Sequence, residues 1–135
     1  MKVYISGPMS DHTWLNFPMF FAAAKHLQSL GYEVANPAML AVELRWRLAP
    51  AVPSYEAYLG NSIMRLESCT AFCQLPGWQS SRGANLEYYM AVGMGLHFIP
   101  LPDNLTPDPE TYDEAMEHRR RLIVNRLQQA QGAAV

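Results

Sequence analysis

A single charged residue interrupts a long uncharged stretch of the chain. Between Gly83 and Pro102 the one Asp, Glu, Lys or Arg residue is Glu87. Because burying an unpaired charge is costly, we expect this carboxylate to face water, a partner or a ligand. On a helix, Gly83 and Ala84 lie one turn earlier on the same face, and their small size leaves a notch above the carboxylate. The pattern indicates a carboxylate that acts on a bound ligand, and a half-exposed helical glutamate is the plainer alternative.

The start of the same expected helix has the features of an anion site. Free backbone N–H groups, the hydroxyls of Ser80 and Ser81 and the helix dipole all favour a bound anion there. Gly83 lets a ligand approach the backbone. One helical turn is about 5.4 Å, so a phosphate at this helix start would lie about one sugar ring from a carbon at Glu87. The alternative is that Ser81 merely caps the helix.

Two loops, residues 7–15 and 76–82, flank this helix start in the expected fold. Gly7 to Ser10 (GPMS) follow the first strand, and Gly7 permits close approach of a ligand to the backbone. No Gly-Lys-Ser/Thr follows, so this is not a Walker phosphate loop, and a structural Gly-Pro turn is the alternative. Trp14 and Trp78 lie in the two loops, where each could stack on a base or pack in the core.

Alternating strands and helices must position these residues. Short β-rich stretches that stop at Gly or Pro are typical of buried strands, and longer apolar stretches bounded by caps predict helices. We expect strands at residues 2–6, 32–35, 71–75 and 97–101, a short helix and loop at 38–53, and longer helices at 17–30, 54–68, 81–94 and 111–129. This alternation predicts an α/β fold, a small doubly wound parallel sheet of four to five strands with helices on both faces. Ligands in such sheets bind beyond the carboxyl ends of the strands, where the loops 7–15, 36–53 and 76–82 lie.

Composition narrows the classes of function. The 135 residues are enough for a single domain, 1–135, with half of them apolar and 16% charged. A net charge of -2 does not suit a nucleic-acid polymer as partner. Two cysteines are too few for a disulfide framework, and no Cys/His spacing predicts a metal site. No apolar run reaches the roughly 18 residues of a membrane helix, and the early Gly-Pro does not suit a signal peptide, so we expect a cytoplasmic protein.

Several blocks of sequence together resemble a known family. They are YISGPM at residues 4–9, NFP at 16–18, NPA at 36–38, LPGW at 75–78 and SRGA at 81–84 with Glu87. In combination they resemble the nucleoside 2-deoxyribosyltransferase-like family, and in particular its small bacterial and phage branch, which is related to deoxynucleoside 5′-monophosphate N-glycosidases. The resemblance covers residues 1–102, and residues 103–135 form a C-terminal loop and helix outside it.

The resemblance implies a flavodoxin-like, or Rossmann-like, fold and a reaction at the N-glycosidic bond of a deoxyribonucleoside or its 5′-monophosphate. It implies that Glu87 attacks the anomeric carbon, that Tyr4 orients this carboxylate and that Ser81 holds a 5′-phosphate. It also implies a homo-oligomer in which neighbouring subunits close the site, and no metal or organic cofactor. The substrate-binding residues that we expect are Gly7, Pro8, Met9, Ser10, Asp11, Trp78, Ser80, Ser81 and Gly83.

One catalytic position departs from the family pattern. The family carries an aspartate that assists protonation of the leaving base, and in the aligned stretch 59–63 (LGNSI) Ser62 or Asn61 replaces it. General acid help is worth about 10²–10⁴ in rate, and a serine hydroxyl cannot supply it at neutral pH. Asp11 or Glu56 could substitute. The alternatives are a nucleotide-binding or sensing protein with weak or lost activity, and a different small-molecule enzyme on the same scaffold.

Overall fold

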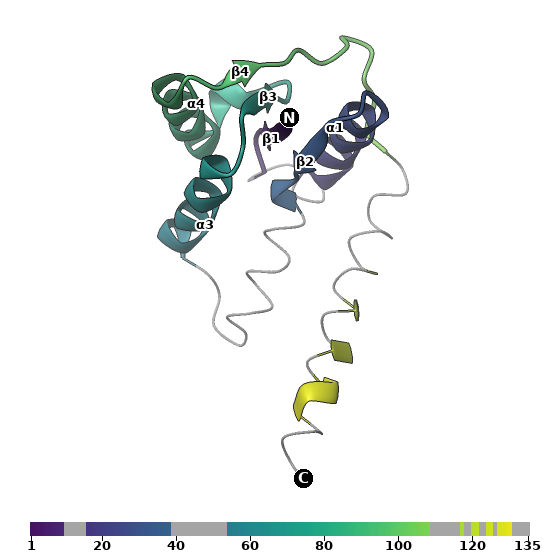
Figure 1. Ribbon diagram of the computed structural model, residues 1–135. Coiled ribbons are helices and arrows are strands. Elements are labelled where there is room, and N and C mark those ends of the chain that lie inside the picture. The colour runs from purple at the N-terminus through teal and green to yellow at the C-terminus, as the bar shows by residue number, and fades with distance from the viewer. Residues whose placement is uncertain are drawn as a thin grey trace.

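The computed structural model contains one parallel sheet (Figure 1). It describes residues 1–9, 16–38 and 54–108, and in the C-terminal part 117, 120–121, 124–125 and 127–130. Within these residues the strands are β1 (Lys2–Ser6), β2 (Glu33–Ala35), β3 (Ala71–Gln74) and β4 (His97–Phe98), in the spatial order β2-β1-β3-β4. The chain therefore begins in the middle of the sheet, runs to one edge and then crosses to the other side, which is the predicted doubly wound arrangement.

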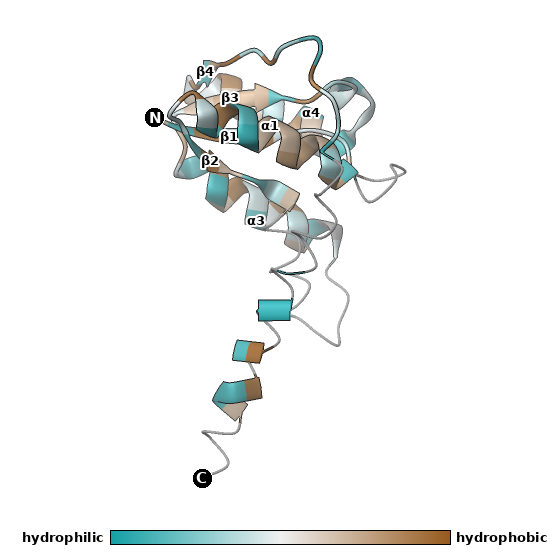
Figure 2. Ribbon diagram, turned by 90° about the vertical axis from the view of Figure 1, so that its right-hand side faces the viewer, coloured by the Kyte–Doolittle hydropathy of each residue, from teal (hydrophilic) through white to brown (hydrophobic). Residues whose placement is uncertain are grey.

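Helices cover both faces of this sheet. Figures 1 and 2 show α1 (Phe17–Ser29) on one side, and α3 (Tyr55–Glu67) with α4 (Arg82–Met94) on the other. A short 3₁₀ helix, η2 (Trp78–Ser80), precedes α4. The α/β class and the parallel sheet that the sequence predicts are confirmed, with four strands in the described part of the chain.

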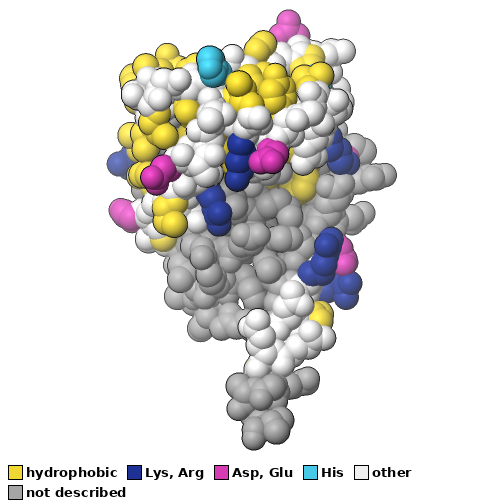
Figure 3. Space-filling model, in the orientation of Figure 1, with side chains coloured by type: hydrophobic (Ala, Val, Ile, Leu, Met, Phe, Trp, Pro, Cys, Tyr) yellow, Lys and Arg dark blue, Asp and Glu magenta, His cyan; other side chains and the backbone are white. Residues whose placement is uncertain are grey.

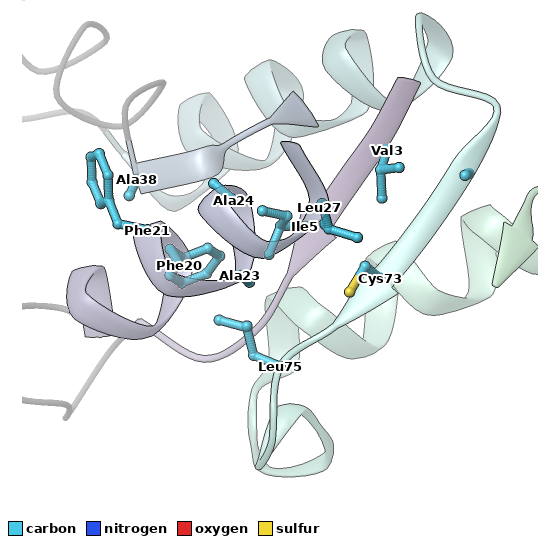
Figure 4. Close-up of a cluster of buried hydrophobic side chains, with 11 residues drawn as sticks. Val3, Ile5, Phe20, Phe21, Ala23, Ala24, Leu27, Ala38, Cys73 and Leu75 are labelled. Atoms are coloured by element: carbon cyan, nitrogen blue, oxygen red, sulfur yellow. The ribbon is translucent and has the colours of Figure 1, made fainter. Parts of the chain in front are cut away.

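The alternating side chains of β1 divide the core into two layers. Val3 and Ile5 pack against Phe20 and Leu27 of α1 (Figure 4). Tyr4 points to the opposite face, where it packs with residues of β3, α3 and α4, namely Phe72, Leu66 and Ala91. Because successive side chains of a strand point to opposite faces, the residue after Ile5 must also lie on the α3 and α4 side.

Caps account for the helix boundaries. Ser54 accepts a hydrogen bond from the backbone of Ala57, and Ser81 accepts one from Ala84, as expected for N-cap serines. Gly95 ends α4 with a φ of 71°, a conformation that glycine adopts without strain. Asn16 differs from the prediction. It precedes α1 but makes no cap bond, because its side-chain amide donates instead to the carbonyl of Pro8 at 2.9 Å.

The last strand is shorter than the predicted 97–101. Its two residues pair with β3, and the backbone of Ile99 then donates one further bond to Phe72. Pro100 and Pro102 have no N–H to continue the ladder, which explains the early end. The chain then packs Ile99, Leu101 and Leu105 against the core on the α1 side, and Asp108 forms an ion pair with Lys25 of α1.

The C-terminal part departs from the body of the domain. Its described residues are helical, and most of them are exposed. They lie away from the sheet in both ribbon views (Figures 1 and 2). The short helix expected within 38–53 falls almost entirely outside the described residues. None of the helices in the described part of the chain is long and apolar enough to cross a membrane.

Candidate functional site

The candidate site lies where β1 ends. Tyr4 and Ser6 are two residues apart on β1, so both side chains face α3 and α4, and both are wholly buried. In a sheet of order β2-β1-β3-β4, the strand order reverses between β1 and β3, and ligands of doubly wound folds bind beyond the carboxyl ends of the strands at that point. Ser6 therefore occupies the last position of β1 at the edge where a ligand is expected.

Glu87 of α4 reaches down to these two side chains. Its exposed fraction is 7%, so the half-exposed alternative is wrong. The hydroxyl of Tyr4 donates a hydrogen bond to Oε2, and the hydroxyl of Ser6 donates to Oε1 at 2.9 Å. Within the described residues no cation pairs with this carboxylate. It is therefore held by neutral donors, one on each oxygen.

Ser62 of α3 completes this group. Helices α3 and α4 pack against each other, and the Ser62 hydroxyl lies near enough to Tyr4 and Glu87 to act against the rise in the pKa of each. The position where the sequence lacks the expected aspartate thus lies directly beside the carboxylate. Glu56, one of the two acids considered as a substitute for the aspartate, is exposed in the first turn of α3.

Burial controls the ionisation of the pair. Desolvation raises the pKa of the Glu87 carboxyl, and hydrogen bonds from Tyr4, Ser6 and Ser62 act in the opposite direction. Burial and then the charge of Glu87 raise the pKa of Tyr4 well above its ordinary value, so the phenol keeps its proton. Tyr4 is therefore a fixed donor to the carboxylate and not a base.

The first loop is bound into the core. A Cβ added to Gly7 would lie 2.7 Å from the Cβ of Leu75, so close packing against the residue that follows β3 explains this glycine. Pro8 is buried, and Met9 packs against the core on the α1 side. Ser10 and Asp11, and likewise Trp14, lie outside the described residues.

Several bonds shape the start of α4. Ser80 is exposed and donates to the carbonyl of Gly77 at 2.8 Å. Ser81 caps the helix by accepting from Ala84, and its own hydroxyl proton can still be donated to a ligand. Outside its chain neighbours and the backbone of its own helix, no described atom lies within 4 Å of the place that a Cβ on Gly83 would take, in keeping with the expected notch.

Trp78 makes an internal contact. Its indole stacks on the ring of Tyr88, with centroids 5.0 Å apart and planes 26° apart. Of the two roles considered for this tryptophan, packing is the one with a visible partner.

Two polar residues, Ser6 and Asn85, make hydrogen bonds in this region that the sequence did not predict. Ser6 donates to the carboxylate, and the signal for it was a polar residue at the end of an apolar strand, in phase with Tyr4. The side-chain amide of Asn85 donates to the carbonyls of Gln79 and Ser81, at 3.0 and 2.7 Å, and so ties η2 to α4. No sequence pattern distinguished this asparagine from a surface one.

The arrangement suits nucleophilic chemistry. An ionised carboxylate offers about four lone-pair positions, and the hydroxyl donors leave at least one of them for an electrophilic carbon. In the described part of the chain no three His, Cys, Asp or Glu side chains are grouped so that they could hold a metal ion.

Comparison with known proteins places the chain in a family. No curated protein and no solved structure matches it. Residues 1–100 match the model of DUF4406, a domain of unknown function, and this range contains the sheet and every residue of the Glu87 group. The chain therefore belongs to the DUF4406 family of domains.

Proposed function

We propose that the protein cleaves or transfers the N-glycosidic bond of a deoxyribonucleoside or deoxynucleoside 5′-monophosphate. The observation that carries the proposal is the buried Glu87 carboxylate, held by Tyr4 and Ser6 at the end of β1. The resemblance of the YISGPM and LPGW blocks to nucleoside 2-deoxyribosyltransferases supports it, because that resemblance implies a glutamate nucleophile at position 87 that a tyrosine at position 4 orients.

The reaction follows double displacement. A carboxylate oxygen of Glu87 attacks C1′ of the sugar, the C1′–N bond breaks, and the base leaves with the bonding electrons. Water or another base then attacks C1′, the ester bond breaks and the carboxylate is restored. Tyr4 and Ser6 keep the carboxylate aimed in both steps, since each holds a different oxygen.

The leaving base must gain a proton, and here Ser62 sets a limit. It lies close to Glu87 at the position where the resemblance implies an aspartate, and a serine is not an acid at neutral pH. Slow hydrolysis, with the proton taken from solvent, follows from this arrangement. The same observation favours a second candidate function, a nucleotide-binding or sensing protein with weak or lost glycosidase activity.

A 5′-phosphate would bind at the start of α4. Ser81 retains a hydroxyl proton, and the open space at Gly83 lets a phosphate approach the helix N-terminus. We expect Ser81→Asp, which keeps the cap acceptor and adds a negative charge, to weaken binding of monophosphates more than binding of nucleosides. Equal affinities before and after the change would contradict the phosphate assignment.

The direct test is release of free base from the four deoxynucleosides and their 5′-monophosphates. Glu87→Ala and Glu87→Gln should both abolish release, because neither side chain can form the ester. Glu67→Gln, at the exposed last residue of α3, is the matched control and should leave release unchanged. Base release that survives in both Glu87 variants would refute the glycosidase. Ligand-induced thermal stabilisation of the unsubstituted protein without turnover would support the binding protein.

We also propose a cytoplasmic homo-oligomer that forms through α4 and β4. Figure 3 shows hydrophobic side chains gathered over this part of the molecule, and the exposed ones are Leu86, Tyr89, Val92, Met94 and Phe98. Residues 83–102 carry one charged side chain, the buried Glu87, so two copies can face each other without like-charge repulsion. Two buried free thiols, Cys69 and Cys73, suit a reducing compartment.

Light scattering after size-exclusion chromatography tests the assembly. Tyr89 is 69% exposed, and Tyr89→Lys should halve the mass or reduce it further by placing charge on the interface. Gln28→Lys, at an exposed position of α1, is the control and should leave the mass unchanged. A monomeric mass for the unsubstituted protein would contradict the proposal.

A further inference from the structure

The side-chain nitrogen of Gln74 is buried and lacks a partner in the described part of the chain. This glutamine is the last residue of β3, and its side-chain Nε2 is closed to solvent yet has no hydrogen-bond partner among the residues that the structure describes. The residue as a whole is partly exposed. Buried polar groups almost always find partners in native proteins, so an exception requires a physical reason.

The position of Gln74 supplies the reason. It pairs in register with Ser6 across the β1–β3 ladder, two residues beyond the pair of Tyr4 and Phe72. Paired residues of parallel strands point to the same face, and neighbouring strands are about 4.8 Å apart. The Gln74 side chain therefore shares the layer of Ser6 and the Glu87 carboxylate, at the β1/β3 switch point.

An apolar residue would fit this strand better than glutamine. The other buried side chains of β3 are Ala71, Phe72 and Cys73, and burying an amide without a partner destabilises the protein. Residues that cost stability in the free protein are a recurrent feature of functional sites.

We propose that Gln74 is a substrate-contacting residue whose amide pairs with a hydroxyl of the sugar. The inference rests on the proposed function, since it places a sugar carbon at Glu87. A carboxamide can donate to a hydroxyl or accept from it, so one side chain satisfies either orientation of the sugar O–H. Three side-chain torsions let the amide turn from its buried position toward the ligand.

The first test uses the ligand-free protein. Gln74→Leu should raise the melting temperature by a few degrees, because it removes an unpaired buried amide and adds apolar contact. Gln28→Leu, on the exposed surface of α1, is the matched control and should leave it nearly unchanged. A lower melting temperature for Gln74→Leu would mean that the amide has a structural role, and would overturn the proposal.

The second test measures binding with Glu87→Gln present throughout, so that no ester forms. Calorimetry compares four forms of one nucleoside 5′-monophosphate, namely the ribo, 2′-deoxy, 3′-deoxy and 2′,3′-dideoxy compounds. With Gln74 present, the form that carries the contacted hydroxyl should bind about three- to tenfold more tightly than the dideoxy form, as expected for one hydrogen bond. Gln74→Leu should abolish this preference. The 2′-deoxy and 3′-deoxy arms identify which hydroxyl is contacted.

The outcomes separate the two proposals. An equal loss of affinity for all four compounds, or no loss for any, would overturn the role of Gln74 and leave the nucleotide site standing. Absence of binding by every compound, both to Glu87→Gln and to the unsubstituted protein measured beside it, would overturn the proposed function and the role of Gln74 together.

Discussion

Removing the hydroxyl of Ser6 would measure how strongly the site depends on the ionised form of Glu87. Ser6 is wholly buried, and its hydroxyl lies 2.9 Å from Oε1 of the carboxylate. A hydrogen bond to a charged group contributes about 1.5–3 kcal/mol to stability, and one between neutral groups about 0.5–1.5 kcal/mol. Ser6→Ala removes no carbon atom, so the lost bond dominates. We expect a loss of about 2 kcal/mol in the free energy of unfolding when Glu87 is ionised, and about 1 kcal/mol when it is protonated.

The dependence on pH follows from the direction of the pKa shift. Burial raises the pKa of Glu87 in the folded state, so the stability that its protonated form contributes is complete below the unfolded pKa. That stability is lost as the pH rises through the folded pKa. Ser6 opposes this shift, and Ser6→Ala therefore raises the pKa of Glu87 further. The loss caused by Ser6→Ala must then be larger at pH 8 than at pH 4.

Urea unfolding at both pH values, followed by circular dichroism, provides the assay. In a parallel thermal scan, a loss of 2 kcal/mol corresponds to a fall of about 7 °C in melting temperature for a domain of this size. In a Glu87→Gln background the loss should shrink to that of a neutral pair and lose its pH dependence. Ser29→Ala, which removes an exposed hydroxyl bonded to the carbonyl of His26, is the control and should cost little at either pH. An equal loss at pH 4 and pH 8, or a full loss with Gln at position 87, would refute the reasoning.

Three further predictions concern the same group of residues. Ser62→Asp should speed base release by about 10²-fold by supplying the missing acid, and steady-state kinetics with a purine deoxynucleotide would measure it; a slower enzyme would contradict the role of position 62. The acid limb of the rate–pH profile should lie above the ordinary pKa of glutamate and move higher in Ser6→Ala, because the attacking form of Glu87 is the carboxylate. Gly7→Ala should destabilise the fold by about 1–3 kcal/mol in thermal unfolding, since the new Cβ would lie 2.7–2.9 Å from three atoms of Leu75; an unchanged melting temperature would show that this contact yields freely.

Local patterns were sufficient for the elements of the fold. The stops at Gly31 and Gly95 and the caps at Ser54 and Ser81 are decided by neighbouring residues, so the strands and helices of the described part could be predicted to within a few positions. The exception was β4, where Pro100 and Pro102 ended the strand sooner than its apolar run suggested. Asn16 held its predicted position, although its amide bonded elsewhere.

The sequence alone singled out Glu87, because it is the one charged residue in the apolar stretch between Gly83 and Pro102. The alternation of a strand at residues 2–6 is also enough to place Tyr4 and Ser6 on one face, although the sequence does not show what that face contacts. Both inferences depend on spacing of a few residues along one element, which is the range over which a sequence can be read directly.

The tertiary structure alone decided what these residues meet. The sheet order places β1 beside β3, and α4 then brings Glu87 onto Tyr4 and Ser6, which lie 83 and 81 positions away in the chain. Ser62 joins them from a third element. No local pattern encodes such contacts, because they arise from the packing of whole helices on a sheet. The burial that raises the pKa of Glu87, and the isolation of the Gln74 amide, are consequences of that packing.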